Sequence, residues 1–282
     1  MKAWIAAVAV AGCQNALDQR LAIVNDTRVL AIVSEPAEAK PGATVAYSAL
    51  VGSPHGPDGD APAWSLCTAP KPPTDDDAVS TACFGSGSSL VAIDPTAAMV
   101  PTDACMQFGP DVQGSGFRPR DPDPTGGYYQ PVRADVPGTD LAFGFTRITC
   151  DLANAPFEVA EAYLKNYVAN ANPTLVVDAP ANVAADSDVT LTASWPAASA
   201  ETYLYYDQVS ETLVTRRESM RVSWYATGGS LPVDATAVDE DDPTTSVSTT
   251  WHTPAAGAAW LWFVLRDSRG GIATASVAVT VQ

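Results

Sequence analysis

Apolar and polar residues alternate with a period of two in two short segments that lie far apart in the chain. Residues 44–50 read Thr-Val-Ala-Tyr-Ser-Ala-Leu, and residues 189–194 read Val-Thr-Leu-Thr-Ala-Ser. This period places apolar side chains on one face of a strand and polar side chains on the other, as in antiparallel sheets with one solvated face. We therefore expect a half-buried antiparallel strand at each position.

The two segments belong to a gapless internal repeat with an offset of 144 positions. The matching pairs are Val33 and Val177, Pro36 and Pro180, Ala37 and Ala181, Val45 and Val189, and Ala49 and Ala193. Each unit has an apolar strand, a bend at proline, a polar turn and an alternating strand, and later a strand with a tryptophan, Trp64 or Trp224. Large aromatic side chains at such positions fill the space between packed sheets. The pattern predicts an all-β fold of two tandem β-sandwiches.

The second unit ends in a predicted hairpin. Residues 260–265 are all apolar, which indicates a strand buried on both faces. Residues 266–271 form a polar, glycine-rich turn, and residues 272–281 alternate again to the end of the chain. These two strands are expected to close the second sandwich.

This hairpin resembles the one that ends PKD and related Ig-like domains, in which a V-x-D-x-x-G-like turn precedes the last strand. Val264, Asp267 and Gly270 occupy the corresponding positions. The resemblance covers residues 174–282 and implies Ig/PKD-like antiparallel sandwiches. An inserted hairpin at about residues 197–218 departs from that family pattern.

The predicted organisation has four parts. They are a signal peptide at residues 1–12, a tether at 13–26, a first Ig-like sandwich at 27–170 and a second sandwich at 173–282. The first sandwich carries an insertion rich in Pro, Gly, Asp and Ser at about residues 68–130. Because long structureless loops are uncommon in compact domains, we expect disulfides to hold this insertion.

Residues 157–168 admit two interpretations. Val159, Tyr163 and Tyr167 are spaced four residues apart, which favours a helix. The final strand of the first sandwich is, however, expected just before the boundary between the two units, and fold context often overrides local propensity. We favour a strand.

The N-terminal residues indicate export and lipid attachment. Lys2 precedes a short apolar run that ends in Val10-Ala11-Gly12-Cys13, and this order is typical of a secretory signal. The tetrapeptide resembles the lipobox of bacterial lipoproteins, which implies that Cys13 is lipidated and becomes the mature N-terminus. The apolar run is too short to span a hydrocarbon core of ~30 Å, so acyl chains would hold the protein on a membrane.

With its W-S-L-C segment and its R-D-S-R-G-G turn, the chain resembles cell-envelope lipoproteins of myxobacteria and their relatives. The resemblance implies a lipid-anchored, non-catalytic protein for binding, scaffolding or adhesion, whose partner is another envelope protein or a glycan. Gln14 stands where an aspartate retains enterobacterial lipoproteins at the inner membrane, which favours the outer membrane. The alternatives are an accessory subunit of an envelope transport or secretion complex and, least favoured, an envelope hydrolase.

Charge and cysteine content agree with export. The formal net charge is −17, which argues against binding to nucleic acid or to anionic headgroups. An even number of cysteines besides Cys13 is typical of an oxidising compartment: Cys67, Cys83, Cys105 and Cys150. They allow three pairings. We favour Cys67–Cys83 with Cys105–Cys150, because the first pair closes a loop rich in Pro and Asp that orders itself poorly.

Catalytic and zinc chemistry have little support in the sequence. There is no G-x-S-x-G motif, so we expect no enzyme. The two histidines are His55, in a turn-like segment, and His252, after a predicted core tryptophan. With two histidines and no C-x-x-C spacing, a zinc site is not expected either.

Calcium is the one cofactor that the sequence leaves open. Residues 239–242 and 75–77 are runs of carboxylates, the hard oxygen ligands that calcium takes. Asp239, Asp241 and Asp242 would be the ligands in the first run. Neither run has the alternating spacing of a defined calcium loop, and solvated turns are the simpler interpretation.

The inserted hairpin carries a group of tyrosines followed by two arginines. Tyr203, Tyr205 and Tyr206 are candidates for a protein interface or for stacking on sugars. Packing within the fold is the competing interpretation, and Tyr128 with Tyr129 has the same ambiguity.

Overall fold

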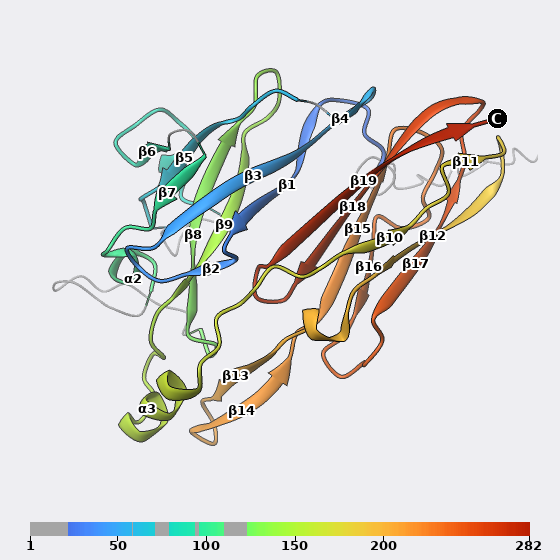
Figure 1. Ribbon diagram of the computed structural model, residues 1–282. Helices are drawn as coiled ribbons and strands as arrows, with labels where there is room; N and C mark the ends of the chain where they lie inside the picture. Colours follow the sequence, from blue (N-terminus) through green and yellow to red (C-terminus); the bar gives the residue numbers. More distant parts are fainter. Residues whose placement is uncertain (1–21, 58, 71–78, 94–95, 110–122) are drawn as a thin grey trace, which may run out of the picture.

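The computed structural model describes residues 22–57, 59–70, 79–93, 96–109 and 123–282. The regular structure of this part of the chain is almost entirely β, and it forms two sandwiches that lie side by side (Figure 1). The predicted all-β, Ig-like class is confirmed. Cys13 and the predicted signal peptide lie outside the described residues.

The first sandwich packs a four-stranded sheet against a five-stranded sheet. The first sheet consists of β1 (Arg28–Glu35), β3 (Thr44–Ser53), β4 (Gly56–Pro57) and β7 (Ala97–Met99). The second has the order β2 (Glu38–Ala39), β9 (Ala142–Thr149), β8 (Gly127–Asp135), β5 (Ala63–Cys67) and β6 (Leu90–Ile93). Tyr47 and Trp64 meet in the core, with ring centroids 5.9 Å apart.

The second sandwich repeats this arrangement. Its three-stranded sheet consists of β10 (Val176–Asp178), β12 (Asp188–Ser194) and β17 (Ser246–His252). Its five-stranded sheet has the order β11 (Asn182–Val183), β19 (Ile272–Val281), β18 (Gly257–Asp267), β15 (Met220–Ala226) and β16 (Ala235–Val238). Trp224 and Phe263 pack edge to face in the core, so the tryptophan of each unit plugs its sandwich.

The sequence repeat corresponds to equivalent strand pairings. Glu38 of β2 lies opposite Arg147 of β9, and Asn182 of β11 lies opposite Thr280 of β19, both in parallel pairs. Glu38 and Asn182 are 144 positions apart, the offset of the repeat. The bend at proline in each unit therefore moves the chain from one sheet to the edge of the other.

Segment 68–130, predicted to be an insertion, supplies β6 and β7 to the two sheets of the first sandwich. It also contains two short helical turns, η1 (Thr81–Cys83) and α2 (Ala104–Gln107). Disulfides join Cys67 to Cys83 and Cys105 to Cys150, the pairing favoured above. Strands of three or four residues among turn-forming residues leave too little alternation for the sequence to reveal them.

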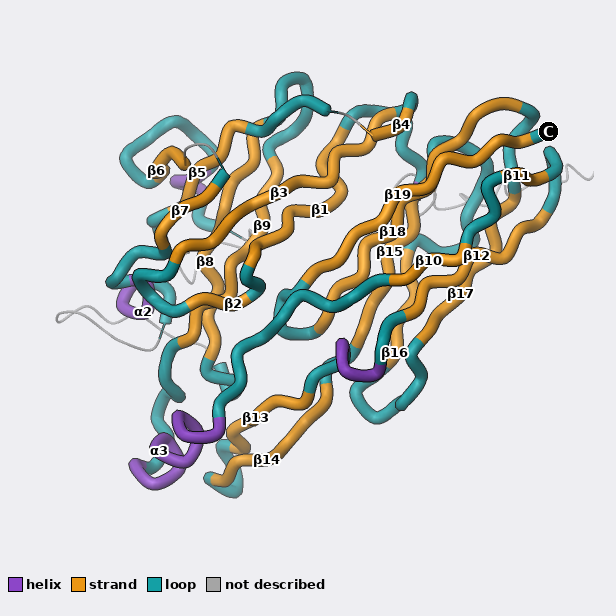
Figure 2. The backbone as a smooth tube through the Cα atoms, viewed as in Figure 1, coloured by secondary structure: helices purple, strands orange, loops and turns teal. Residues whose placement is uncertain are grey.

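The strand favoured for residues 157–168 is wrong, because this segment contains helix α3 (Phe157–Asn166; Figure 2). Strand β9 already supplies the last strand of the first sandwich. The helical spacing therefore prevails, and Tyr163 is fully buried on the apolar face, where its hydroxyl donates to the carbonyl of Thr125. No helix in the described part of the chain is long and apolar enough to span a membrane.

The described end of the predicted tether is packed rather than free. Ala22 and Val24 are buried, and the amide of Val24 donates to the carbonyl of Ala226 at the end of β15. Val24 also joins Leu30 and Trp262 in an apolar cluster between the two sandwiches. This cluster explains why the strand at 260–265 is apolar on both faces, because one face packs in the core and the other at the junction.

Candidate functional site at the junction of the two sandwiches

The acidic run at residues 239–242 does not gather into a calcium site. Asp239 and Asp241 are exposed, and the carboxylate of Asp242 accepts a hydrogen bond from the amide of Thr244. The hydroxyl and the amide of Thr244 together lower the pKa of Asp242. Among the described residues no group of three or more Asp, Glu, His or Cys side chains is placed to hold a metal ion. The carboxylates of this turn therefore do not converge as calcium requires. The second run, at 75–77, lies outside the described residues.

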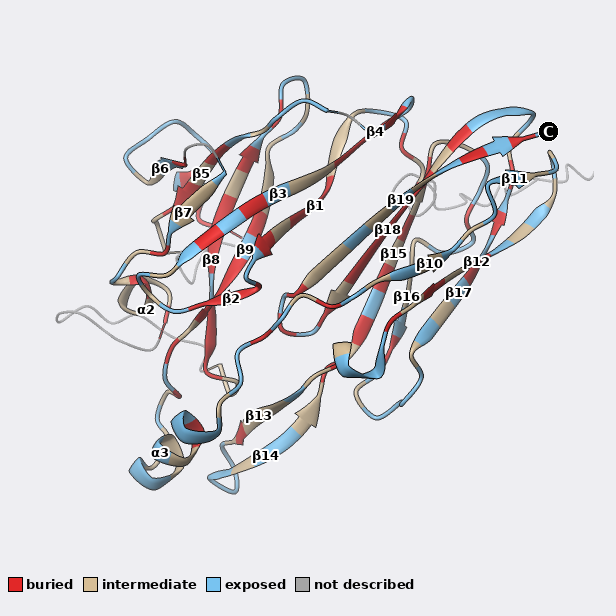
Figure 3. Cartoon of the chain, viewed as in Figure 1, coloured by how far each residue is buried: buried red, intermediate tan, exposed pale blue. Residues whose placement is uncertain are grey.

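The inserted hairpin consists of β13 (Thr202–Asp207) and β14 (Thr212–Arg217), which follow the 3-10 turn η2 (Ala197–Ser199). Tyr206 is buried with Tyr163 of α3, and its amide donates to the carbonyl of Pro124 in the first sandwich. Tyr205 is covered by Arg216, whose guanidinium carbon lies 3.7 Å from the ring centroid. Tyr203 lies beneath Arg269, whose guanidinium carbon is 5.1 Å from the ring centroid. Tyr206 thus helps to connect the two sandwiches, Tyr203 and Tyr205 pack against arginines of the second, and the exposed residues of the hairpin lie mostly on β14 (Figure 3).

The two histidines lie at different surface sites. His55 is exposed in the turn between β3 and β4. His252 pairs across strands with both Asp188 and Ser230, and its Nδ1 lies 2.9 Å from a carboxylate oxygen of Asp188. These three residues line a shallow hollow of about 350 Å³. The histidine and aspartate side chains are 52% and 73% exposed, and no hydrogen bond joins the Ser230 hydroxyl to His252 within the described residues.

We expect that a fluorophosphonate probe does not label Ser230. A nucleophilic serine needs a base that accepts its proton in a site shielded from water, and here the hydroxyl has no such bond and the trio is solvated. Intact-mass spectrometry after incubation with the probe measures the result, with Ser230→Ala as the control. An adduct on the wild-type chain that is lost in this variant would show a hydrolase-like serine.

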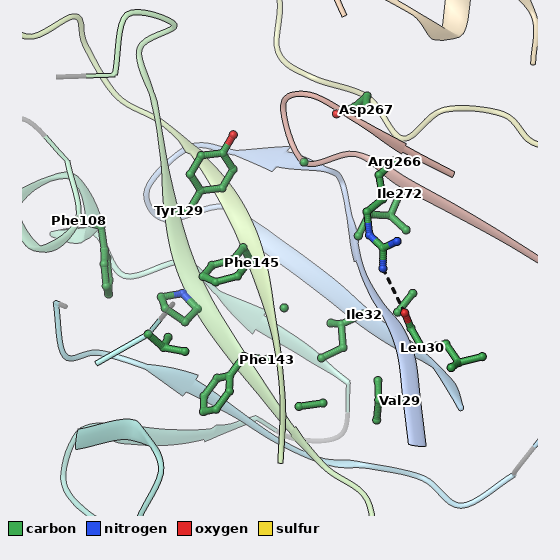
Figure 4. A pocket seen from close by; sticks show the side chains of 16 residues that line it. Val29, Leu30, Ile32, Phe108, Tyr129, Phe143, Phe145, Arg266, Asp267 and Ile272 are labelled. Atoms are coloured by element: carbon green, nitrogen blue, oxygen red, sulfur yellow. Dashed lines mark hydrogen bonds between the residues drawn. The ribbon is translucent and has the colours of Figure 1, made fainter. Parts of the chain in front are cut away.

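A cavity of about 710 Å³ lies at the junction of the two sandwiches (Figure 4). Its walls come from β1, from the outer face of β8 and β9, and from the turn between β18 and β19. Most of the lining side chains are apolar or aromatic, and two are charged: Leu30, Ile32, Tyr129, Phe143 and Phe145 belong to the first group, Arg266 and Asp267 to the second. We call this cavity the junction groove.

One wall of the junction groove is aromatic. Phe143 and Phe145 project outward from β9. Tyr129 and Phe145 are each 37% exposed, and their rings pack edge to face. Gly144, between the two phenylalanines, faces Ile32 of β1, where an added Cβ would lie 2.6 Å from a methyl carbon. Glycine therefore lets β9 and β1 approach each other while the flanking rings remain in the groove.

The opposite wall carries Arg266 of β18. Its guanidinium donates to the carbonyl of Leu30 at 3.1 Å and to the hydroxyl of Ser223 at 3.2 Å. Burial lowers the pKa of Arg266, and no described carboxylate lies within ion-pair distance of it. Arg266 is thus a partly buried cation whose partners are neutral oxygens.

A buried ion-pair cluster lies beside the groove in the second sandwich. The Nε of Arg269 donates to Glu218 at 2.7 Å, and a terminal nitrogen donates to Glu201 at 3.1 Å. Asp267 accepts the amides of Arg269 and Gly271 at 2.8 Å each, so the V-x-D-x-x-G-like turn is closed by its own aspartate. We call this cluster the Arg269 clamp.

A second buried ion pair lies in the first sandwich. The Nε of Arg147 is 3.2 Å from a carboxylate oxygen of Glu38, an ion pair without hydrogen-bond geometry. Glu38 also accepts the hydroxyl of Tyr167 and, at 2.7 Å, the amide of Asn170. Although burial acts to lower it, the pKa of Arg147 is raised by Tyr129 and Glu38.

Two residues connect the clusters of the two sandwiches. Asn170 donates through its amide to Glu38 and through its side chain to Asp267 at 3.3 Å. The hydroxyl of Tyr129 accepts from Arg147 at 3.1 Å and donates to the carbonyl of Arg269 at 3.2 Å. The wall of the groove and the relative placement of the sandwiches are therefore fixed by the same network.

The junction groove is not among the sites predicted from the sequence. A signal for its aromatic wall exists in residues 142–149, where phenylalanines flank a glycine and apolar residues occupy both phases of the strand. Arg266 and Arg269 lie in the R-D-S-R-G-G turn, and the polar composition of this turn predicts that it is exposed to solvent. Their burial depends on contacts with the other sandwich and with residues 168–172.

No protein-family model matches the chain, and no curated protein matches it in sequence. Several solved structures show a distant similarity to it. The fibronectin(III)-like modules of Clostridium thermocellum CbhA are 14% identical over 91% of this chain and 94% of theirs, with a TM-score of 0.27. The D0-D1 domain of intimin is 12% identical over 89% of this chain and 98% of its own, with a TM-score of 0.23.

A superoxide reductase (neelaredoxin) from Ignicoccus hospitalis is also similar, with 14% identity over 46% of this chain and 90% of its own and a TM-score of 0.27. These proteins differ widely in activity. At such identities and TM-scores the likeness assigns no activity, and the fold class rests on the strands and sheets described above.

Proposed function

We propose that this protein is a lipid-anchored, non-catalytic binding module of the cell envelope, and that it holds an envelope component in the junction groove. The observation that carries the proposal is the groove itself. A cavity of about 710 Å³ with mostly apolar walls and a few polar groups has the size and character of a small-molecule or side-chain binding site. Its walls belong to both sandwiches, so the tandem arrangement creates it.

The placement on a membrane is part of the proposal and is supported by the sequence. Cys13 follows a short apolar run and small residues, as in bacterial lipoproteins. A net charge of −17 gives an anionic bilayer surface no electrostatic attraction for the protein, so acyl chains would supply the attachment. The outer membrane is the location that Gln14 favours.

A photo-crosslinking residue in place of Phe145 tests the binding site in the native envelope. We expect this position to capture an envelope component that mass spectrometry identifies, because its ring lies exposed in the groove. The matched control replaces Val176 of β10, which is 54% exposed on the other sandwich and does not line the groove. If an envelope component is captured at Val176 but not at Phe145, or if the same adduct forms at both positions, the groove is not the binding site.

The same preparations test the anchor. The Cys13→Ala chain is expected to move from the membrane fraction to the soluble fraction, because no helix in the described part of the chain can replace the lipid. A Cys13→Ala chain that still floats with membranes would contradict lipid anchoring and leave the crosslinking result to stand alone.

A further inference from the structure

We propose that the junction groove binds a long-chain carboxylate of the fatty-acid type, with Arg266 as the counter-ion of the head group and the aromatic wall around the chain. This inference rests on the proposed function in taking the groove as the binding site. It adds the chemical class of the ligand.

The walls are suited to an alkyl chain. Leu30 and Ile32 of β1 lie opposite Phe143 and Phe145 of β9, and few polar side chains interrupt the apolar lining (Figure 4). Alkyl chains bind such surfaces through the removal of apolar area from water, with no demand for hydrogen bonds. A volume of about 710 Å³ accommodates one chain of a small amphiphile.

Arg266 is the charged group that lacks a counter-ion. The two most buried arginines at the junction, Arg147 and Arg269, each pair with a buried carboxylate, Glu38 or Glu218. Arg266 instead donates to the Leu30 carbonyl and the Ser223 hydroxyl, and it also interacts with the hydroxyl of Tyr225. These partners are uncharged at neutral pH, and the charge of the neighbouring Arg221 is repulsive. In a chain with 32 acidic residues, a desolvated cation without an acidic partner is expected to receive one from a ligand.

The nearest acidic residue in sequence does not neutralise Arg266. Asp267 accepts hydrogen bonds from the amides of Arg269 and Gly271 and from the side chain of Asn170. Its carboxylate is therefore committed to the turn and to the linker. The described ion pairs include none between Asp267 and Arg266.

The count of polar groups favours a ligand with a single head. A glycan would bring many hydroxyls into the groove, and a peptide would bring an amide and a carbonyl for each residue. Polar groups buried without partners are costly, and the lining offers few donors and acceptors that are not already bonded. A ligand with a carboxylate at one end of an apolar chain needs only one charged hydrogen-bond donor, and Arg266 is such a donor.

Equilibrium dialysis of radiolabelled palmitate against the full chain carrying Cys13→Ala tests the inference without the protein's own lipid. We expect saturable binding of one palmitate, and about tenfold weaker binding to Arg266→Met, because a charge-assisted pair is lost. Arg266→Lys should retain most of the affinity. The matched control is Arg221→Met, since Arg221 is the cross-strand neighbour of Arg266 and is exposed, and it should bind within about twofold of the parent.

Palmitate methyl ester has the same alkyl chain but no charged head group, so it distinguishes the contribution of the charge from that of the chain. It should bind weakly and equally to the parent chain and to Arg266→Met. Phe145→Gln, a change at a half-exposed position that leaves the core intact, should weaken binding of acid and ester alike. No binding of palmitate to the parent, or equal binding to Arg266→Met, overturns the ligand class. If palmitate does not bind while Phe145 crosslinks to a protein or glycan in the envelope, the inference fails and the proposed function stands.

Discussion

Replacing Arg269 by methionine is expected to lower the free energy of unfolding by about 3–5 kcal/mol at pH 8. The guanidinium is 2% exposed and holds Glu218, which is 1% exposed, together with Glu201 and the carbonyl of Val168. Removal of one partner of a buried ion pair leaves the other charge desolvated and unpaired, which is the reason for a loss of this size. Guanidinium unfolding followed by tryptophan fluorescence measures it.

The loss should be smaller at pH 5 than at pH 8. Burial, and to a lesser extent the nearby Asp267, raises the pKa of Glu218 to about 7, above its ordinary value of 4.5. In the native protein Glu218 therefore takes up a proton as the pH falls below 7, while in the unfolded chain it does so only near 4.5. Protonation of Glu218 thus contributes to the free energy of unfolding in full below pH 4.5, and this contribution is lost as the pH rises through 7. At pH 5 a protonated Glu218 tolerates the missing arginine better.

Two variants control for a general effect of the substitution. Arg216→Met removes a partly exposed arginine that lies over the ring of Tyr205 and 3.8 Å from Glu240, and it should change the stability by about 1 kcal/mol or less. Adding Glu218→Gln to Arg269→Met should restore part of the loss at pH 8, because no buried charge remains at that position. A loss for Arg269→Met that is below 1 kcal/mol, or equal at both pH values, contradicts a charged and buried clamp.

Replacing Trp262 by alanine is expected to lower the stability by about 3–5 kcal/mol and to separate the unfolding of the two sandwiches. Trp262 has no accessible surface and packs with Val24 and Leu30 between the sandwiches, so its removal leaves a large cavity at the junction. Calorimetry should show one transition for the wild-type chain and two for the variant, since domains that share less interface unfold more independently.

Trp262→Phe is the matched control for this experiment. The indole Nε1 of Trp262 has no hydrogen-bond partner in the described part of the chain, so phenylalanine loses apolar contact and no hydrogen bond. Its effect should be less than half that of alanine, with a single transition retained. One unchanged transition in Trp262→Ala would show that the sandwiches are coupled elsewhere.

The fold could be predicted from the sequence wherever a pattern is repeated. Period-two alternation at residues 44–50 and 189–194 and a tryptophan in each unit are local signals, and the five-stranded sheets of the two sandwiches have equivalent strand orders. Helix α3 shows the limit of this reasoning. Its side-chain spacing is helical, but the final strand expected for the first sandwich favoured a strand there, and β9 already supplies that final strand.

The junction groove could not be predicted from the sequence, because it depends on how the two sandwiches pack against each other. Periodicity says that Phe143 and Phe145 share a face of β9, but the sequence carries no signal that β1 and the turn after β18 meet them there. The same holds for the buried charges. From the sequence alone, Arg269 and Asp267 are expected to be solvated turn residues. In the structure, Asn170 and Tyr129 hydrogen-bond to this turn and connect it to the first sandwich.

The central claim is that the junction holds the two sandwiches as one body, so that the groove is formed before any ligand arrives. Pulsed electron-spin measurements between labels at Val91→Cys and Val176→Cys test this most directly, in a Cys13→Ser background that leaves the disulfides intact. Val91 lies on β6 of the first sandwich and Val176 on β10 of the second, and both are at least half exposed. One narrow distance distribution, broadened by Trp262→Ala, is the expected result. A broad distribution or several maxima in the otherwise unchanged chain would contradict a preformed groove.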